Sequence, residues 1–215
     1  ENILFEKKDG VAYLTLNRPD QLNALNSAVL KELDDALAAI DGDAEIRVLV
    51  VRGAGEKALA AGADITEMQS MEAEAGMAFG AFGQKVFAKI EALRQPSIAM
   101  IPGFALGGGC ELALACDIRI ASEKARFGQP EVGLGITAGF GGTQRLPRLV
   151  GRGAASLLLF SGNMIDAAEA LRIGLVDKIV PHDALAAEVS ALAEGIARQA
   201  RCAVQQTKRC IRHGL

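Results

Sequence analysis

Hydrophobic positions recur along the chain in two alternating patterns, short apolar runs and longer stretches with one apolar face. The short runs, rich in branched residues, predict buried β-strands at residues 11–16, 46–51, 97–101, 118–121 and 176–180. Apolar residues spaced three or four apart predict helices at 27–40, 66–93, 111–116, 143–150, 154–160 and 167–171, and two more within 185–212. Strands that alternate with helices predict an α/β fold with parallel strands and right-handed crossovers.

Two segments interrupt these patterns with glycine. Gly76, Gly80 and Gly83 lie in the long helix predicted at 66–93, where each costs about 0.8–1 kcal/mol relative to alanine. Close packing against a neighbouring element is the preferred explanation, and a mobile cover over a binding site is the alternative. Residues 127–142 are irregular, and an irregular stretch of this length inside a compact domain is usually functional.

A third glycine-rich segment joins the strand 97–101 to the helix 111–116. Gly107, Gly108 and Gly109 leave backbone N–H groups bare, and the helix that follows adds the positive end of its dipole. Such a turn suits an anion, or an oxygen that becomes one during a reaction. Glu111 stands one turn further on, and a carboxylate beside an oxyanion-binding turn indicates catalysis.

Glu111 and Glu131 are the candidate catalytic carboxylates, because both flank irregular, glycine-rich backbone. Taken alone, Glu111 fits a stabilising acid at the start of a helix equally well, and Glu131 fits an ordinary turn residue better. Asp64 is also typical of a helix cap. Together with the glycine turn, the two glutamates favour a catalytic site.

Other catalytic motifs are absent from the sequence or lack their context. Residues 133–138 match G-x-G-x-x-A, but no apolar strand precedes them and no acid occurs between Glu131 and Asp166. Neither a G-x-x-x-x-G-K-[ST] phosphate loop nor a G-x-S-x-G nucleophile elbow occurs. The two histidines, His182 and His213, are typical of surface residues.

Composition and charge limit the expected partners. The chain has 215 residues, 50% hydrophobic and 23% charged, which is ordinary for a globular protein with a sizeable core. A formal net charge of −3 gives no electrostatic reason to expect nucleic acid or an anionic membrane. Four cysteines without metal-site spacing indicate reduced thiols in a cytoplasmic protein. A basic cluster of Lys208, Arg209 and Arg212 is typical of a solvated helix face.

Segments along essentially the whole chain, in the right order, resemble the crotonase superfamily, and within it the short-chain enoyl-CoA hydratases. The clearest are GGGCE at 107–111 and FGQPEVGLG at 127–135; the others are NRP at 17–19, NAL at 23–25, AGADI at 61–65 and GGTQRL at 141–146. The resemblance implies a ClpP/crotonase-type β/α spiral core over residues 1–182. Residues 183–215 would begin a C-terminal helical trimerisation region, which in family members continues past Leu215.

The resemblance also implies roles for particular residues. Glu111 would be the base toward water and Glu131 the acid, and the two should titrate as a coupled pair. The amides of Ala63 and Gly108 would form an oxyanion hole, and the backbone of Gly139 would help to place the water. The segments that contact substrate or line the coenzyme A path would contribute Ala24, Ala61, Gly62, Ala63, Asp64, Ile65, Thr66, Gly107 and Gly108.

The activity implied is that of a hydro-lyase of fatty acid β-oxidation, adding water in syn fashion across the 2,3 double bond of a short-chain 2-enoyl-CoA. An isomerase or another acyl-CoA enzyme of the superfamily is the nearest alternative, and a non-catalytic binding or scaffold protein is an alternative from a different class. Retention of both glutamates favours the hydratase. The expected partners are an acyl-CoA thioester and further copies of the chain in a homotrimer or homohexamer, with no metal, no separate cofactor, no nucleic acid and no membrane.

Overall fold

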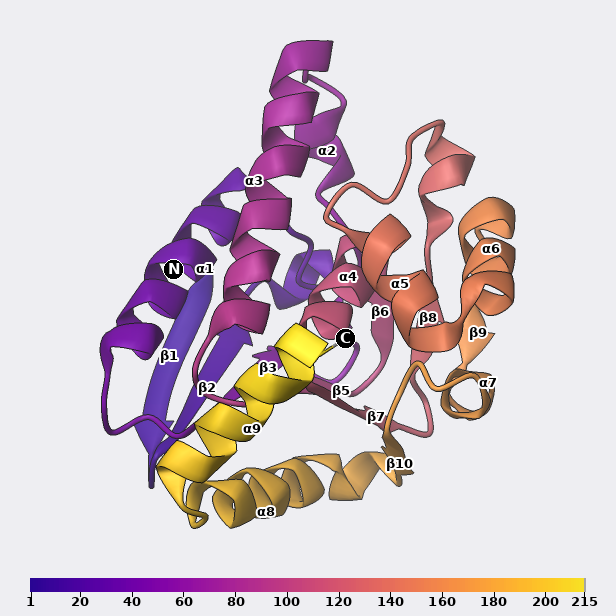
Figure 1. Cartoon of the computed structure of the whole chain (residues 1–215). Helices are drawn as coiled ribbons and strands as arrows, with labels where there is room; N and C mark the ends of the chain where they lie inside the picture. Colours follow the sequence, from indigo (N-terminus) through magenta and orange to yellow (C-terminus); the bar gives the residue numbers. More distant parts are fainter. Residues whose placement is uncertain (215) are drawn as a thin grey trace.

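Two β-sheets form the centre of the computed structural model, which describes residues 1–214 (Figure 1). In spatial order, the larger sheet contains β1 (Ile3–Lys8), β2 (Val11–Leu16), β3 (Val48–Gly53), β5 (Ser97–Ile101), β7 (Ile118–Ser122) and β10 (Lys178–Val180). The smaller sheet contains β4 (Ala58–Ala60), β6 (Phe104–Leu106), β8 (Arg126–Gly128) and β9 (Ile165–Asp166). Paired strands are parallel except for β1 with β2 and β8 with β9. The predicted α/β fold is therefore confirmed.

Helices and turns connect these strands. In chain order they are η1 (Pro19–Gln21), α1 (Ser27–Gly42), α2 (Ile65–Met68), α3 (Ala73–Ala92), α4 (Gly108–Ala115), η2 (Pro130–Leu134), α5 (Gly142–Val150), α6 (Arg152–Ser161), α7 (Ala167–Arg172), η3 (His182–Ala184), α8 (Leu185–Ala197) and α9 (Arg201–Gly214), where η marks a 3₁₀ turn. Successive side chains along a strand of the larger sheet point to opposite faces, and different helices cover the two faces. Leu14 and Leu49 pack in the cluster that holds α1, α3 and α4, whereas Tyr13 and Val50 pack against α8.

The predicted helix over 66–93 is wrong as a single element. The chain forms the short helix α2, leaves helical structure after Met68 and begins α3 at Ala73. The cap of α2 is Asp64, whose side chain accepts a hydrogen bond from the amide of Thr66 at 3.1 Å. The interpretation of Asp64 as a helix cap is therefore confirmed.

The strand that leads into the glycine turn also differs from the prediction. The sequence pattern placed β5 directly before Gly107, but the short strand β6 lies between them and belongs to the smaller sheet. β6 pairs with both β4 and β8, so the segments before Ala61, Gly107 and Gln129 run side by side. This parallel arrangement delivers three of the motif segments to the same edge of the smaller sheet, at the carboxyl ends of its strands.

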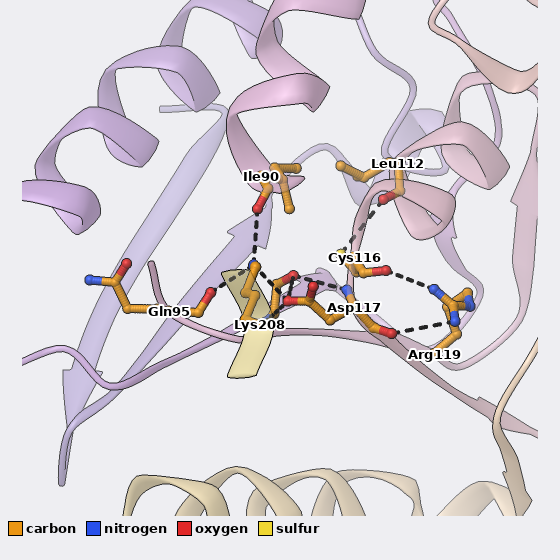
Figure 2. A network of polar contacts seen from close by, with 8 residues as sticks. Ile90, Gln95, Leu112, Cys116, Asp117, Arg119 and Lys208 are labelled. Atoms are coloured by element: carbon orange, nitrogen blue, oxygen red, sulfur yellow. Dashed lines mark hydrogen bonds and ion pairs between the residues drawn. The ribbon is translucent and has the colours of Figure 1, made fainter. Parts of the chain in front are cut away.

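Lys208 on α9 does not belong to a solvated face, unlike its neighbours Arg209 and Arg212, which are exposed. Its side chain is only 9% exposed, and its Nζ donates to Asp117 Oδ2 at 2.7 Å and to the carbonyl of Gln95 at 2.9 Å. Figure 2 shows this ammonium group at the end of α3 and the beginning of β7. The expectation of a solvated lysine is therefore wrong, and Lys208 fastens α9 to the body of the protein.

Candidate active site

Glu111 is presented by the first turn of α4. The turn begins at Gly107, whose backbone angles (φ +49°, ψ −123°) are accessible essentially only to glycine. The amide of Glu111 donates to the carbonyl of Gly107 at 2.9 Å, which completes the turn. Glu111 does lie in the first turn of α4, but its side chain points into the protein and is 1% exposed, so the alternative of an exposed acid is wrong.

The carboxylate of Glu111 is held by two backbone amides from the loop before α5. Its Oε1 accepts hydrogen bonds from Phe140 N at 2.8 Å and from Gly142 N at 2.6 Å. Burial raises the pKa of Glu111 to about 7, and the nearby charge of Glu131 acts in the same direction. The two amide donors oppose this rise without cancelling it. Glu111 is therefore fixed in place and can exchange a proton near neutral pH.

This raised pKa predicts that Glu111 lowers the stability of the folded chain as the pH increases. A carboxyl whose pKa rises from its ordinary 4.5 to about 7 on folding binds its proton more tightly in the folded state. Its contribution is complete below its unfolded pKa and is lost as the pH rises through the folded value. Relative to Glu111→Gln, we expect the unfolding free energy of the unmodified chain to fall by about 3 kcal/mol from roughly pH 4 to pH 8. Urea unfolding of both proteins across this range checks the result, and a constant difference would contradict it.

Glu131 lies beside the glycine turn, in η2. A methyl group on Gly107 would stand 2.9 Å from its Oε1, so the bare α-carbon of Gly107 makes room for this carboxylate. Burial raises the pKa of Glu131 as well. The side-chain amide of the buried Gln129 lies against Glu131, and the orientation that turns its nitrogen toward the carboxylate lets it donate to Oε1 and Oε2 at 2.9 and 3.1 Å. Sequence reasoning missed Gln129, whose only signal is a polar residue between a strand and a turn.

Ala63 and Gly108 are brought to neighbouring stretches of backbone. The amide of Leu25 donates to the carbonyl of Gly62, and the amide of Asp64 donates to the carbonyl of Leu25, so Ala63 is held between two fixed peptides. The α-carbon of Gly62 would lie 3.7 Å from a methyl group on Gly107. Within residues 1–214, neither the amide of Ala63 nor that of Gly108 donates a hydrogen bond to the protein. Two bare amides beside one turn can bind an anionic oxygen.

Gly139 and Phe140 pack against α3. The carbonyl of Gly139 accepts a hydrogen bond from Gln84 Nε2 at 2.8 Å. The ring of Phe140 lies edge-on between Phe79 and Phe87, with centroids 5.3 and 5.5 Å away, and occupies the space a side chain at position 83 would fill. Close packing as the explanation of a glycine in α3 is therefore confirmed at Gly83. A methyl group added at Gly76 would meet open space, and one added at Gly80 would lie 3.7 Å from the carbonyl oxygen of Gly139.

The other candidate substrate-contact residues lie along the neighbouring loop and α2. Arg18 joins two of them, because it donates to the carbonyl of Ala24 at 2.7 Å and forms an ion pair with Asp64 at 2.9 Å. Ala61 is half-buried, and Ile65 and Thr66 are exposed at the start of α2.

Three further side chains bear on what the site can contain. His182 is not a simple surface residue, because its ring lies between Ser122 Oγ at 3.3 Å and Glu56 at 3.6 Å. His213 is exposed on α9, as predicted. Burial raises the pKa of the Cys110 thiol, which keeps this neighbour of Glu111 neutral.

In residues 1–214, no three His, Cys, Asp or Glu side chains lie together as metal ligands would, and none of the helices there could span a membrane.

Comparison with known proteins identifies the family. Residues 6–215 match the family described as enoyl-CoA hydratase/isomerase. The chain is 53% identical to the short-chain-enoyl-CoA hydratase of Clostridium acetobutylicum, covering all of this chain and 82% of that protein. It is 52% identical to the crotonyl-CoA hydratase of Syntrophomonas wolfei, covering all of this chain and 83% of the relative. The crystal structure of an enoyl-CoA hydratase from Bacillus anthracis matches with a TM-score of 0.97 and 43% identity, covering 100% of this chain and 83% of the other. The resemblance is confirmed, and the chain belongs to the enoyl-CoA hydratase/isomerase family of the crotonase superfamily.

Proposed function

We propose that the chain catalyses the reversible addition of water to the 2,3 double bond of short-chain 2-enoyl-CoA thioesters. The observation that supports this most directly is a pair of carboxyls with raised pKa values, the buried Glu111 and the half-buried Glu131, beside the bare amides of Ala63 and Gly108. Hydration of a conjugated thioester requires a base, an acid and a site for a negatively charged oxygen, and these groups supply all three. The names of the relatives from Clostridium acetobutylicum and Syntrophomonas wolfei, a short-chain-enoyl-CoA hydratase and a crotonyl-CoA hydratase, agree with this substrate class.

In the proposed reaction, the thioester oxygen accepts hydrogen bonds from the amides of Ala63 and Gly108. As water adds to C3, electrons move through the double bond to this oxygen, where each fixed donor is worth about 2.7–4 kcal/mol of barrier. Glu111 takes a proton from the water molecule while the oxygen of that water bonds to C3. Protonated Glu131 gives its proton to C2, and the carbonyl re-forms.

The hydrogen bonds of Glu111 suit it to act as the base. Its Oε1 is occupied by Phe140 N and Gly142 N, and within residues 1–214 its Oε2 accepts no hydrogen bond, which leaves Oε2 to receive the proton of water. The backbone of Gly139 adjoins this carboxylate and helps to place the water. Burial raises the pKa of Glu131 as it does that of Glu111, so both carboxyls can carry a proton at a higher pH than an ordinary glutamate, and the division into base and acid follows the resemblance to the family. Both carboxyls would act from the same face of the double bond, which gives syn addition.

Coenzyme A is part of the substrate in this proposal and no separate cofactor takes part. The thioester would enter along the segment 61–66 beside Ala24 and the glycine turn. Asp64 serves this path indirectly, because its carboxylate caps α2 and pairs with Arg18. This arrangement fixes the backbone of the segment that carries the Ala63 amide.

We further propose that the chain works as a homotrimer or a dimer of trimers in the cytoplasm. Apolar side chains on α6 and after it are strongly exposed, with Leu157, Phe160 and Met164 at 68%, 79% and 56%. An exposed apolar patch of this kind favours contact with another copy of the chain. The helical residues 183–214 would contribute to those contacts, and the free thiols of the four cysteines favour a reducing compartment.

Hydration of crotonyl-CoA tests the proposed function. We expect loss of the absorbance of the conjugated thioester at a rate proportional to protein concentration, with 3-hydroxybutanoyl-CoA as product. A series of 2-enoyl-CoA substrates from C4 to C16 then measures the chain-length preference. Conversion of 3-enoyl-CoA to 2-enoyl-CoA without hydration would favour the isomerase, and binding of acetyl-CoA without either reaction would favour a non-catalytic member.

A further inference from the structure

Arg145, on α5, connects the loop that holds Glu111 to the end of α3. Its Nη1 donates to the carbonyl of Phe140 at 2.7 Å, and its Nη2 donates to Glu91 Oε2 at 2.6 Å. The arginine side chain is only 14% exposed, and that of Glu91 is 36% exposed. A guanidinium group forms both bonds in a fixed planar geometry, so it sets the distance between the loop and the helix.

Phe140 is therefore held through both of its peptide groups. Its amide donates to Glu111 Oε1, while its carbonyl accepts from Arg145. The ring of the same residue is locked against α3 by Phe79 and Phe87. A displacement of this carbonyl would rotate the adjoining peptide groups and move the amides that place the Glu111 carboxylate.

Arg145 also affects the charge environment of Glu111. Its positive charge lowers the pKa of Glu111, opposing burial and the charge of Glu131, which both raise it. The charged groups that act on this carboxyl are Glu131 from η2 and Arg145 from α5, with Glu91 on α3 compensating Arg145. Cys110, the neighbour on α4, stays neutral because burial raises the pKa of its thiol.

We propose that Arg145, anchored by Glu91, is a positioning residue for Glu111, acting through the carbonyl of Phe140. This inference rests on the proposed function, in which Glu111 is the base that activates water. Arg145 has no part in binding the thioester, so its effect falls on the chemical step and not on substrate affinity.

Kinetics of Arg145→Gln and Arg145→Lys test the positioning role. For Arg145→Gln we expect kcat to fall by roughly 10²-fold with KM changed little, because small misplacements of a catalytic group are this costly. The acid limb of the kcat–pH profile should move to higher pH, because loss of the positive charge raises the pKa of Glu111. Arg145→Lys should restore the position of that limb but only part of kcat, since an ammonium group cannot form both bonds in the same plane.

Two further variants separate positioning from general damage. Arg148, on the same helix, is exposed and, among the residues 1–214, donates only to Gln144, so Arg148→Gln should leave kcat and the pH profile unchanged. Glu91→Gln keeps the arginine but removes its compensating charge, so the acid limb should move to lower pH, opposite to its shift in Arg145→Gln. Equal losses of kcat in Arg145→Gln and Arg145→Lys, with no shift of the pH profile in either, would overturn the proposal.

Titration of Glu111 by carbon NMR keeps this test independent of the proposed reaction. The carboxyl signal of Glu111 is assigned by its disappearance in Glu111→Gln, and its pKa is then measured in each folded variant. A pKa that rises in Arg145→Gln and falls in Glu91→Gln supports the coupling even if no hydration is found. An unchanged Glu111 pKa in both variants would refute it even if the chain is an active hydratase.

Discussion

Replacing Glu111 with glutamine is expected to lower kcat for crotonyl-CoA hydration by about 10²–10⁴-fold, the contribution of one positioned general acid–base group. The amide oxygen of glutamine can still accept from Phe140 N and Gly142 N, so the loop before α5 should keep its place. KM should change little, because in the proposed reaction Glu111 acts on the water and does not hold the thioester. Steady-state kinetics with crotonyl-CoA measure both constants.

The matched comparisons for this prediction are Glu131→Gln and Glu123→Gln. Glu131→Gln should cause a loss of the same order, because it removes the proton donor. Glu123 is exposed and forms no side-chain hydrogen bond within residues 1–214, so its replacement should leave kcat unchanged. If the variants of Glu111 and Glu131 both retained most of the activity, the two acids would be structural and the proposed mechanism would be wrong.

The second large effect is expected for Gly109→Ala, which should destabilise the fold by about 3 kcal/mol or more. A methyl group at this position would stand 2.0 Å from the carbonyl oxygen of Ala60, a backbone atom of β4 that has no freedom to move aside. α4 would have to shift away from the smaller sheet, carrying the Gly108 amide and Glu111 with it. Denaturant unfolding measures the stability, and the fraction of folded protein that remains should have a reduced kcat.

Gly76→Ala provides the control for a glycine replaced within a helix. This position of α3 is exposed and has no atom within 4 Å of the added methyl group. The variant should be more stable by about 0.8–1 kcal/mol, the difference in helix propensity. If Gly109→Ala were as stable as the unmodified chain, the predicted clash between its methyl group and the carbonyl of Ala60 would be wrong.

The elements with a long hydrophobic pattern could be predicted from the sequence. Helix α1 repeats apolar residues at helical spacing and is buried on that face, so the predicted helix 27–40 corresponds closely to Ser27–Gly42. Strand β1 was missed because five of its six residues are exposed, and an exposed edge strand carries no alternating signal. Strands β4, β6 and β8 have three residues each, too few to show a period of two.

Part of the candidate site could likewise be predicted from the sequence, and part could not. Glu111 and the glycine turn are adjacent in the sequence, and the physical reason for their pairing can be seen there. The role of Arg145 depends on a contact with Glu91, 54 residues earlier, and that of Gln129 depends on its burial. Neither property leaves a local pattern, because both arise only when α3, α5 and the smaller sheet are packed together.

The stripe on α3 formed by Phe79, Gly83, Phe87 and Glu91 has a consequence for protein engineering. These positions are four residues apart and thus lie on one side of the helix, and all four contact Phe140 or Arg145. Substitutions in α3 should therefore leave this side untouched and be confined to the outward-facing positions. Such substitutions should not disturb the loop that holds the carboxylate of Glu111, the proposed base.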